Sequence, residues 1–261
     1  MRCKKNVQWY MTATILGVSL IVACGSPESY MPTEVSSIRQ KVDTPQTYNP
    51  DWAVKYALEN YNRVYGAGPN DTPFPSYPPR EITLPDGSKV WVGGNCTNFV
   101  SRAIIAGLVK DSNAGKVFGR IGDFDIDATG GLYQWYMLPD GRHGPAFTGA
   151  DKLYEYAVYN TARNKGLHFS YVTHDTLTTF MDYTKVQKGD IIFMDIRADG
   201  SVDHAMIVTD TDWFRLGYNE IQVTYQTPEL ANQRLGKINE KYGHRAVFYV
   251  YRPTDYNPDG R

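Results

Sequence analysis

The sequence lacks several features that would point to common functions. It has 27 basic and 28 acidic residues, a net charge of −1, and no block of Lys and Arg that could follow a nucleic-acid backbone. It also lacks the helix motif of zinc metalloproteases and the glycine-rich loop that cradles phosphates. We therefore expect no nucleic-acid partner, no metal and no cofactor.

Cysteine is scarce, and the position of each cysteine carries information. An apolar stretch over residues 11–23, too short to span a membrane, follows a basic start and ends in Ile21-Val22-Ala23-Cys24. This ending resembles the box at which bacterial lipoprotein signal peptides are cut before a cysteine that is then lipid-modified. Residues 1–23 are thus predicted to be a lipoprotein signal peptide, with Cys24 as the lipidated residue that anchors an exported chain to a membrane of the cell envelope. An ordinary secretory signal with an incidental cysteine is the alternative.

Removal of this segment takes away three positive charges and no negative ones, so the net charge changes from −1 to −4. Cys3 is lost with the signal, and an acylated Cys24 cannot form a disulfide, which leaves Cys96 as a single free thiol. Cysteines of exported proteins are usually paired in disulfides, so a single free thiol calls for an explanation, and a catalytic role is the leading one.

Cys96 follows Gly93-Gly94-Asn95 and opens a segment with apolar residues at helical spacing. We expect it on the first turn of a helix, with Asn95 as the N-cap. Backbone N–H groups and the helix dipole favour a thiolate there, and the thiolate is the attacking species. A buried structural cysteine is the alternative.

The rest of the chain predicts one domain over residues 49–252, preceded by a flexible tether (24–48) and followed by a short tail (253–261). The domain opens with a helix capped by Asn49, and a second helix is expected over 150–165, with a capping box from Thr148 and Asp151 and an end at Gly166. The other predicted elements are a turn at 85–87 between two short strands, and strands at 191–196, 204–209, 221–227 and 246–251.

Helices followed by a mostly antiparallel sheet describe an α+β domain. A helix-borne Cys followed by a strand-borne His is the chain order of papain-like enzymes. The blocks around Asn49-Pro50-Asp51-Trp52, Asn95-Cys96-Thr97-Asn98-Phe99 and Asp203-His204-Ala205-Met206 resemble, in order, those of the bacterial putative amidase domain. That family is similar to the NlpC-type and CHAP cysteine hydrolases of cell walls.

The resemblance implies a papain-like fold in which N-terminal helices, with Cys96 at a helix start, pack on the sheet that carries His204. It also implies a cysteine-dependent hydrolase of amide bonds, with Cys96 as nucleophile, His204 as base and a thioester acyl-enzyme between the two half-reactions. The residues support this chemistry independently, because imidazole titrates near neutral pH. Taken alone, His204 is equally well read as a half-exposed strand residue.

The residue that orients the imidazole is expected at Gln226, where the family more often has His. A Gln carbonyl oxygen can accept the imidazole N–H but carries no charge to stabilise imidazolium, and ordinary strand polarity is the alternative. Asp203 is a weaker candidate, since neighbouring strand residues point to opposite faces. Backbone N–H groups near Cys96, helped by Asn95 or Asn98, are the expected oxyanion donors.

Two other patterns carry less weight. Asp123, Asp125 and Asp127 alternate as at the start of a calcium loop, but Ala128 and Gln134 replace the turn glycine and the bidentate Glu, which favours a solvated acidic loop. The twenty tyrosines could line a groove for glycan or peptide, although core and sheet packing explains most of them.

Together these observations predict a monomeric, lipid-anchored envelope protein that hydrolyses an amide bond in a cell-wall peptide or another substrate. Peptidoglycan stem peptides are the nearest abundant candidate. Acyl transfer to an amine is an alternative with the same chemistry. A non-catalytic surface lipoprotein that binds cell wall or protein with the same fold is an alternative of a different class.

Overall fold

The computed structural model describes residues 45–63, 79–84, 86–114, 121–122, 134–137, 143–160, 166–176, 181–211 and 221–257. The predicted signal peptide, Cys24, most of the tether and the acidic segment from Asp123 to Asp127 lie outside the described residues. None of the helices in the described part of the chain is long and apolar enough to cross a membrane.

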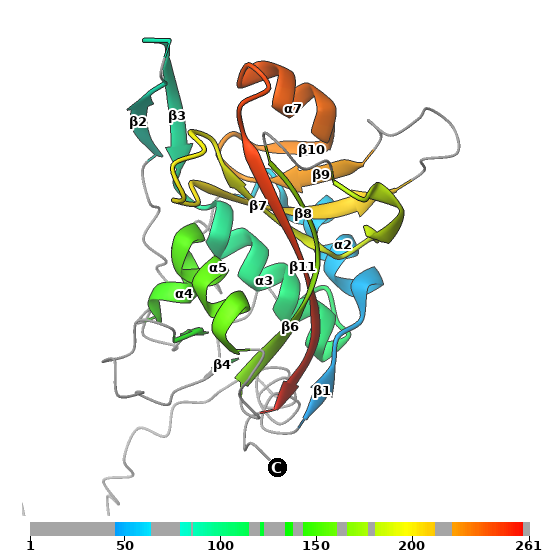
Figure 1. Ribbon diagram of the computed structural model, residues 1–261. Coiled ribbons are helices and arrows are strands. Elements are labelled where there is room, and N and C mark those ends of the chain that lie inside the picture. The colour runs from blue at the N-terminus through cyan, green and yellow to red at the C-terminus, as the bar shows by residue number, and fades with distance from the viewer. Residues whose placement is uncertain are drawn as a thin grey trace, which may run out of the picture. The chain divides into compact units, whose positions relative to one another are not determined.

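A seven-stranded antiparallel sheet forms the centre of the described domain, in the order β1-β11-β7-β8-β9-β10, with β6 paired to β11 (Figure 1). Its strands are β1 (Gln46–Thr47), β6 (Gly166–Asp175), β7 (Ile191–Asp195), β8 (His204–Asp210), β9 (Gln222–Tyr225), β10 (Leu230–Arg234) and β11 (Val247–Asn257). Two further antiparallel pairs are the hairpin of β2 (Pro79–Thr83) with β3 (Lys89–Gly93), and β4 (Ile121–Gly122) with β5 (Tyr136–Met137).

The helices are α2 (Pro50–Asn60), α3 (Cys96–Val109), α4 (Pro145–Thr148), α5 (Ala150–Tyr159) and α7 (Leu235–Lys241), with a 3-10 turn, η2, at Tyr183–Lys185. The side chain of Asn49 accepts a hydrogen bond of 3.0 Å from the N–H of Asp51, which confirms the predicted start of α2. Gly107 of α3 lies so close to the ring of Tyr48 that a side chain at this position would collide with it. This close approach fixes the entry to α2 against α3.

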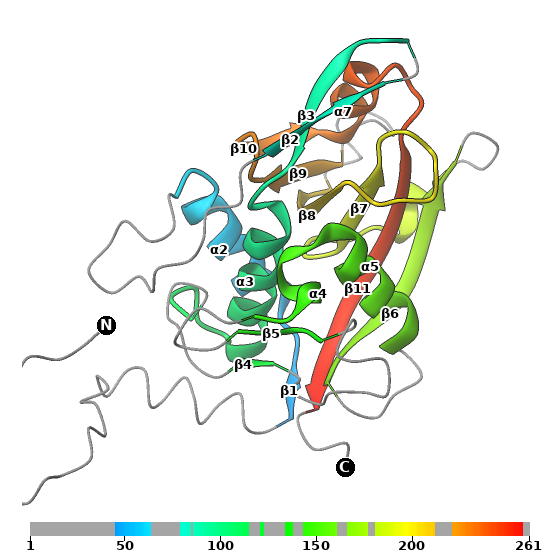
Figure 2. The same cartoon turned by 90° about the vertical axis from the view of Figure 1, so that its left-hand side faces the viewer.

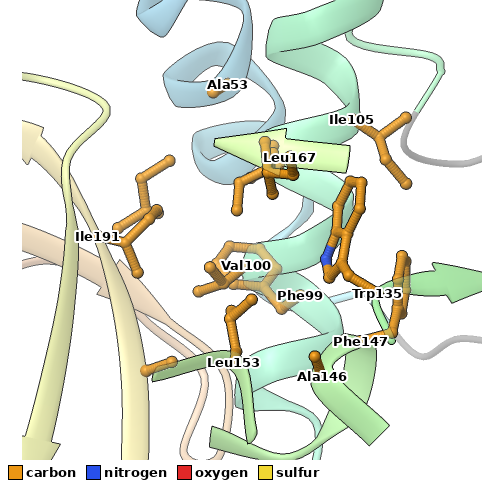
Figure 3. Packing of buried hydrophobic residues seen from close by; sticks show 14 of the residues in the cluster. Ala53, Phe99, Val100, Ile105, Trp135, Ala146, Phe147, Leu153, Leu167 and Ile191 are labelled. Carbon is orange, nitrogen blue, oxygen red and sulfur yellow. The ribbon is translucent and has the colours of Figure 1, made fainter. Parts of the chain in front are cut away.

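The two faces of the sheet are buried in separate apolar clusters. The first joins α2, α3, α4 and α5 to the face that carries Phe193, Ala205 and Ile207, and Figure 3 shows Phe99, Val100 and Trp135 packed in it. The second joins the opposite face to α7 and to Leu84 beside the β2–β3 hairpin. Because both faces are covered, β7 is buried at every position, which explains its continuous apolar run.

The α+β class predicted from the sequence is confirmed. The predicted capping box is wrong, because α5 is preceded by Gly149 and has no side-chain hydrogen bond at its start. The predicted end is wrong too. The helix stops at Tyr159, and Gly166, with a φ of 92°, begins strand β6.

The tail predicted from residue 253 also differs from the structure, because β11 continues to Asn257. Residues 255–257 pair with β1 and β6 across an irregularity in register between Pro253 and Tyr256. Pro253 has no N–H to donate to a ladder, and the irregular register accommodates it. Strand β1 likewise lies within the segment expected to be tether.

Candidate active site

Cys96 lies where the β2–β3 hairpin runs into α3. Gly94, with a φ of 80°, turns the chain between β3 and the helix, and Cys96 is the first of its 14 residues. Asn95 occupies the N-cap position as predicted, but its side chain makes no capping hydrogen bond. Its backbone N–H instead donates to Oγ1 of Thr227, in the turn after β9, at 3.2 Å. A non-local contact therefore fixes the start of this helix.

The thiol of Cys96 is buried among hydrogen-bond donors. Its Sγ lies 3.6 Å from Oγ1 of Thr97 and accepts from the backbone N–H of Ala205, while the N–H groups of Thr97 and Cys96 itself act in the same direction. These donors lower the pKa of the thiol, but burial has the larger effect, so the pKa of Cys96 is raised. The expectation of a resting thiolate is therefore wrong, because desolvation outweighs the helix terminus.

His204 is the first residue of β8 and is also buried. Its ring meets that of Tyr225 edge-on, with centroids 4.9 Å apart. Burial, and secondarily the charge of Lys241, lowers the pKa of His204 to about 3. Its Nε2 is buried and has no hydrogen-bond partner among the described residues. The resting site therefore holds a neutral imidazole with an unused ring nitrogen.

The structure brings the predicted nucleophile and base to the start of the same strand but does not join them. Ala205 lies on the α3 side of the sheet, and the His204 ring lies on the α7 side, beside Met194 and Ile238. No hydrogen bond links Sγ of Cys96 to the ring of His204 in the part of the chain that the structure describes. Catalytic hydrogen bonds are often long or misaligned before substrate binds, so the dyad stays a prediction.

Gln226 holds a structural position. Its Nε2 donates to the backbone carbonyls of Asn60 and Arg63, both at 3.1 Å. These are carbonyls at and just after the end of α2, where the helix has no N–H donors of its own to offer them. The side chain thus ties the turn after β9 to α2, and its role in orienting His204 stays a prediction.

Asn98, the second predicted oxyanion neighbour, is buried on α3. Its Oδ1 accepts a 2.9 Å hydrogen bond from Nε of Arg102, and its Nδ2 is buried without a partner within the described ranges. Asn98 follows Cys96 by two residues, and side chains at that spacing do not share a face of a helix, so its role as an oxyanion donor stays a prediction.

Asp203 belongs to a charge network that the sequence did not reveal. Its carboxylate accepts from the backbone N–H of Ile196 at 3.2 Å and from Arg80 at 3.3 Å, and Arg197 lies 3.9 Å away. Burial raises the pKa of Asp203 despite these partners. Arg80 lies on β2, so this network ties the β2–β3 hairpin to the residue before His204.

The imidazole of His204 borders a small hollow of about 10 Å³, which has room for about one water molecule. Trp91 of β3 forms one wall and is 60% exposed, and Thr227 forms another. The sequence reasoning missed Trp91, although an aromatic residue five positions before a candidate nucleophile was a signal for it. A second hollow, of about 90 Å³, shares Ile196 and Tyr242 with the first.

The remaining histidines of the described ranges lie elsewhere. Nδ1 of His168 lies 2.9 Å from Asp255, and His174 contacts the hydroxyl of Tyr171. No group of three or more His, Cys, Asp or Glu among the described residues is placed to hold a metal ion.

Comparison with known families gives one match. Residues 47–251 match the family model described as putative amidase domain, which spans both Cys96 and His204. Comparisons with curated proteins and with solved structures gave no match.

Proposed function

This chain belongs to the putative amidase domain family, and from that membership and the setting of Cys96 we propose that it is a cysteine-dependent hydrolase of an amide bond. Membership of this family indicates hydrolysis of an amide bond but specifies neither the nucleophile nor the substrate. One observation carries the cysteine mechanism: Sγ of Cys96 lies at the start of α3 among backbone N–H donors, one of which belongs to the residue after His204.

The chemistry proceeds in two half-reactions. Nε2 of His204 takes the thiol proton as Sγ of Cys96 attacks the carbonyl carbon, and the carbonyl electron pair moves to oxygen. Backbone N–H groups at the start of α3, with Nδ2 of Asn98, stabilise that oxyanion. When the pair returns, the C–N bond breaks and His204 gives its proton to the leaving amine. Water then attacks the thioester, giving a proton to His204, and Sγ leaves and is reprotonated.

Burial sets the charge state of the resting pair. It raises the pKa of the Cys96 thiol and lowers that of the His204 imidazole to about 3, so thiol and imidazole both rest neutral. The proton transfer therefore creates two charges, and it needs the substrate to bring the two side chains together. This differs from enzymes that hold a preformed thiolate–imidazolium pair.

The substrate proposal rests on the sequence. With Cys24 lipidated, the domain is tethered at a membrane of the cell envelope, where peptidoglycan stem peptides are the nearest abundant amides. The alternative, a non-catalytic lipoprotein that binds cell wall or protein, is favoured by the absence, among the described residues, of a hydrogen bond between Sγ of Cys96 and the ring of His204.

Incubation of the purified protein with purified peptidoglycan, followed by mass analysis of released fragments, tests the proposal. Wild type should release fragments with new amino and carboxyl termini, and Cys96→Ser should release none. Tyr159→Ala, which truncates an exposed side chain on α5, is the control. Identical fragments from wild type and Cys96→Ser exclude the thiol as nucleophile, and the absence of fragments with any wall preparation favours the binding alternative.

A further inference from the structure

We propose that Thr227 is a positioning residue for the proposed nucleophile, because its hydroxyl fixes the backbone of Asn95, the residue before Cys96. Thr227 lies in the turn that follows β9, and its Oγ1 accepts the N–H of Asn95 at 3.2 Å. Figure 2 shows β9 and β10 next to the point where β3 runs into α3. The inference rests on the proposed function, since it treats the Cys96 thiol as the nucleophile, but its test measures the thiol directly.

The backbone of Thr227 adopts a conformation that β-branched residues rarely take. Its φ of 64° lies in the left-handed region, which glycine and asparagine enter far more readily. The turn is held at both ends, because the Gln226 side chain donates to two carbonyls at and just after the end of α2 and Leu230 pairs again with Tyr225. A glycine would follow the same path without strain but would carry no hydroxyl. A strained threonine at this position therefore points to a task for its side chain.

The start of α3 lacks the local contacts that usually hold a helix N-terminus. Asn95 occupies the N-cap position but makes no side-chain capping hydrogen bond. In a capping box, the side chain three positions later accepts the N–H of the N-cap residue. Here that residue is Asn98, whose Oδ1 accepts from Nε of Arg102 at 2.9 Å instead. The hydroxyl of Thr227, 132 residues away in the chain, takes this place.

Asn95 and Cys96 are adjacent, so the contact with Thr227 determines where the thiol lies. Sγ of Cys96 reaches from the first turn of α3 to the N–H of Ala205 on β8. Among the groups that lower the pKa of this thiol, that N–H has the largest effect. A shift of the helix start relative to β8 lengthens the contact and weakens the stabilisation of a thiolate. Thr227 thus acts on the thiol through Asn95.

Alkylation of the full chain by iodoacetamide over a range of pH tests this role, with the product followed by mass analysis of the peptide that contains Cys96. Thr227→Val keeps the branched shape but removes the hydroxyl, and Thr227→Ser keeps the hydroxyl. We expect the midpoint of the alkylation profile to rise by about 0.5–1 pH unit in Thr227→Val, the shift that corresponds to the loss of one hydrogen bond to the thiolate. Thr227→Ser should retain the wild-type midpoint.

Thr227→Gly separates the hydroxyl from the backbone strain. It removes both, so we expect the same rise in the alkylation midpoint as in Thr227→Val, but unfolding at a higher urea concentration than in that variant. Thr83→Val, the same substitution at an exposed position of β2, is the matched control and should leave the alkylation profile unchanged.

An unchanged alkylation midpoint in Thr227→Val and Thr227→Gly overturns the inference, even where stability falls, because the hydroxyl then has a structural role only. An equal rise in Thr227→Ser overturns it too. A rise that depends on the hydroxyl, in a protein that cleaves no wall amide, keeps the positioning role and removes the proposed function. Cleavage that requires Cys96, without such a rise, removes the positioning role alone.

Discussion

Acid should destabilise this protein through His204. The pKa of its imidazole is about 3 in the folded protein against 6.5 for an unperturbed histidine, so between these values the unfolded chain binds the extra proton. Unfolding is therefore favoured as the pH falls, and the stability present above pH 6.5 is lost progressively toward pH 3. The free energy of unfolding then falls by up to about 1.4 kcal/mol per pH unit, which amounts to a loss of roughly 2 kcal/mol between pH 6.5 and 4.5.

Urea unfolding of wild type and His204→Gln at both pH values isolates this effect. Glutamine does not titrate, so the free energy of unfolding of the variant should fall by roughly 2 kcal/mol less than that of wild type over this range. Burial raises the pKa values of Asp190 and Asp203, an effect of opposite sign that is present in both proteins and cancels in the difference. Equal losses in wild type and variant would refute the assignment of His204 as a buried, neutral imidazole.

Three further predictions follow from individual contacts. Because burial raises the pKa of the Cys96 thiol, its alkylation by iodoacetamide should accelerate only at a pH above the pKa of a model thiol; alkylation fastest at mildly acidic pH would point to a preformed ion pair. Arg252 makes hydrogen bonds of 2.7 and 2.9 Å to Asp190, and Arg252→Met should cost about 1.5–3 kcal/mol of unfolding free energy, because that buried carboxylate keeps only the N–H of Gln187 as a partner. Lys237→Met, which removes a surface pair, should cost less than about 1 kcal/mol, and similar losses in the two variants would contradict this reasoning. Gln226→Ala removes two hydrogen bonds, to the carbonyls of Asn60 and Arg63, and should lower the free energy of unfolding by about 1–3 kcal/mol. Turnover of Gln226→Ala and Gln226→His must therefore be compared at equal folded fraction. Lower turnover in the alanine variant supports an orienting role, and equal turnover contradicts it.

Local sequence patterns predicted the elements whose signals are local. The cap at Asn49 and the turn around Gly87 depend on residues within one turn of each other, and both are present. The helix that begins at Cys96 was predicted from its own apolar spacing, although a distant contact with Thr227 fixes its start. The strands at 191–195 and 204–210 were found because both faces are buried and the residues are continuously apolar.

Errors arose where distant contacts override local preference. Gly166 reads as a helix end, but it begins a strand that pairs with Asn257 at the far end of the chain. The last strand was predicted to end at residue 251, yet β11 continues past Pro253 because β1 and β6 pair with the following residues. The expectation that Cys96 rests as a thiolate failed for the same reason. The burial that raises the pKa of Cys96 results from packing between distant segments, which local sequence patterns do not predict.

The position of the thiol itself depends on where β9 ends. In β8 the N–H of Val208 donates to Asp190 beside β7, so by the alternation of an antiparallel strand the N–H of Ala205 faces the β9 side. Pairing of β8 with β9 reaches Ile207 and Thr224, and β9 then ends at Tyr225 and turns away through Gln226 and Thr227. The N–H of Ala205 is left without a strand partner, and Sγ of Cys96 takes that place. The same turn supplies the Thr227 hydroxyl to Asn95 and the Gln226 amide to α2. Displacing this turn should therefore move Sγ of Cys96, although no residue of the turn lies on α3.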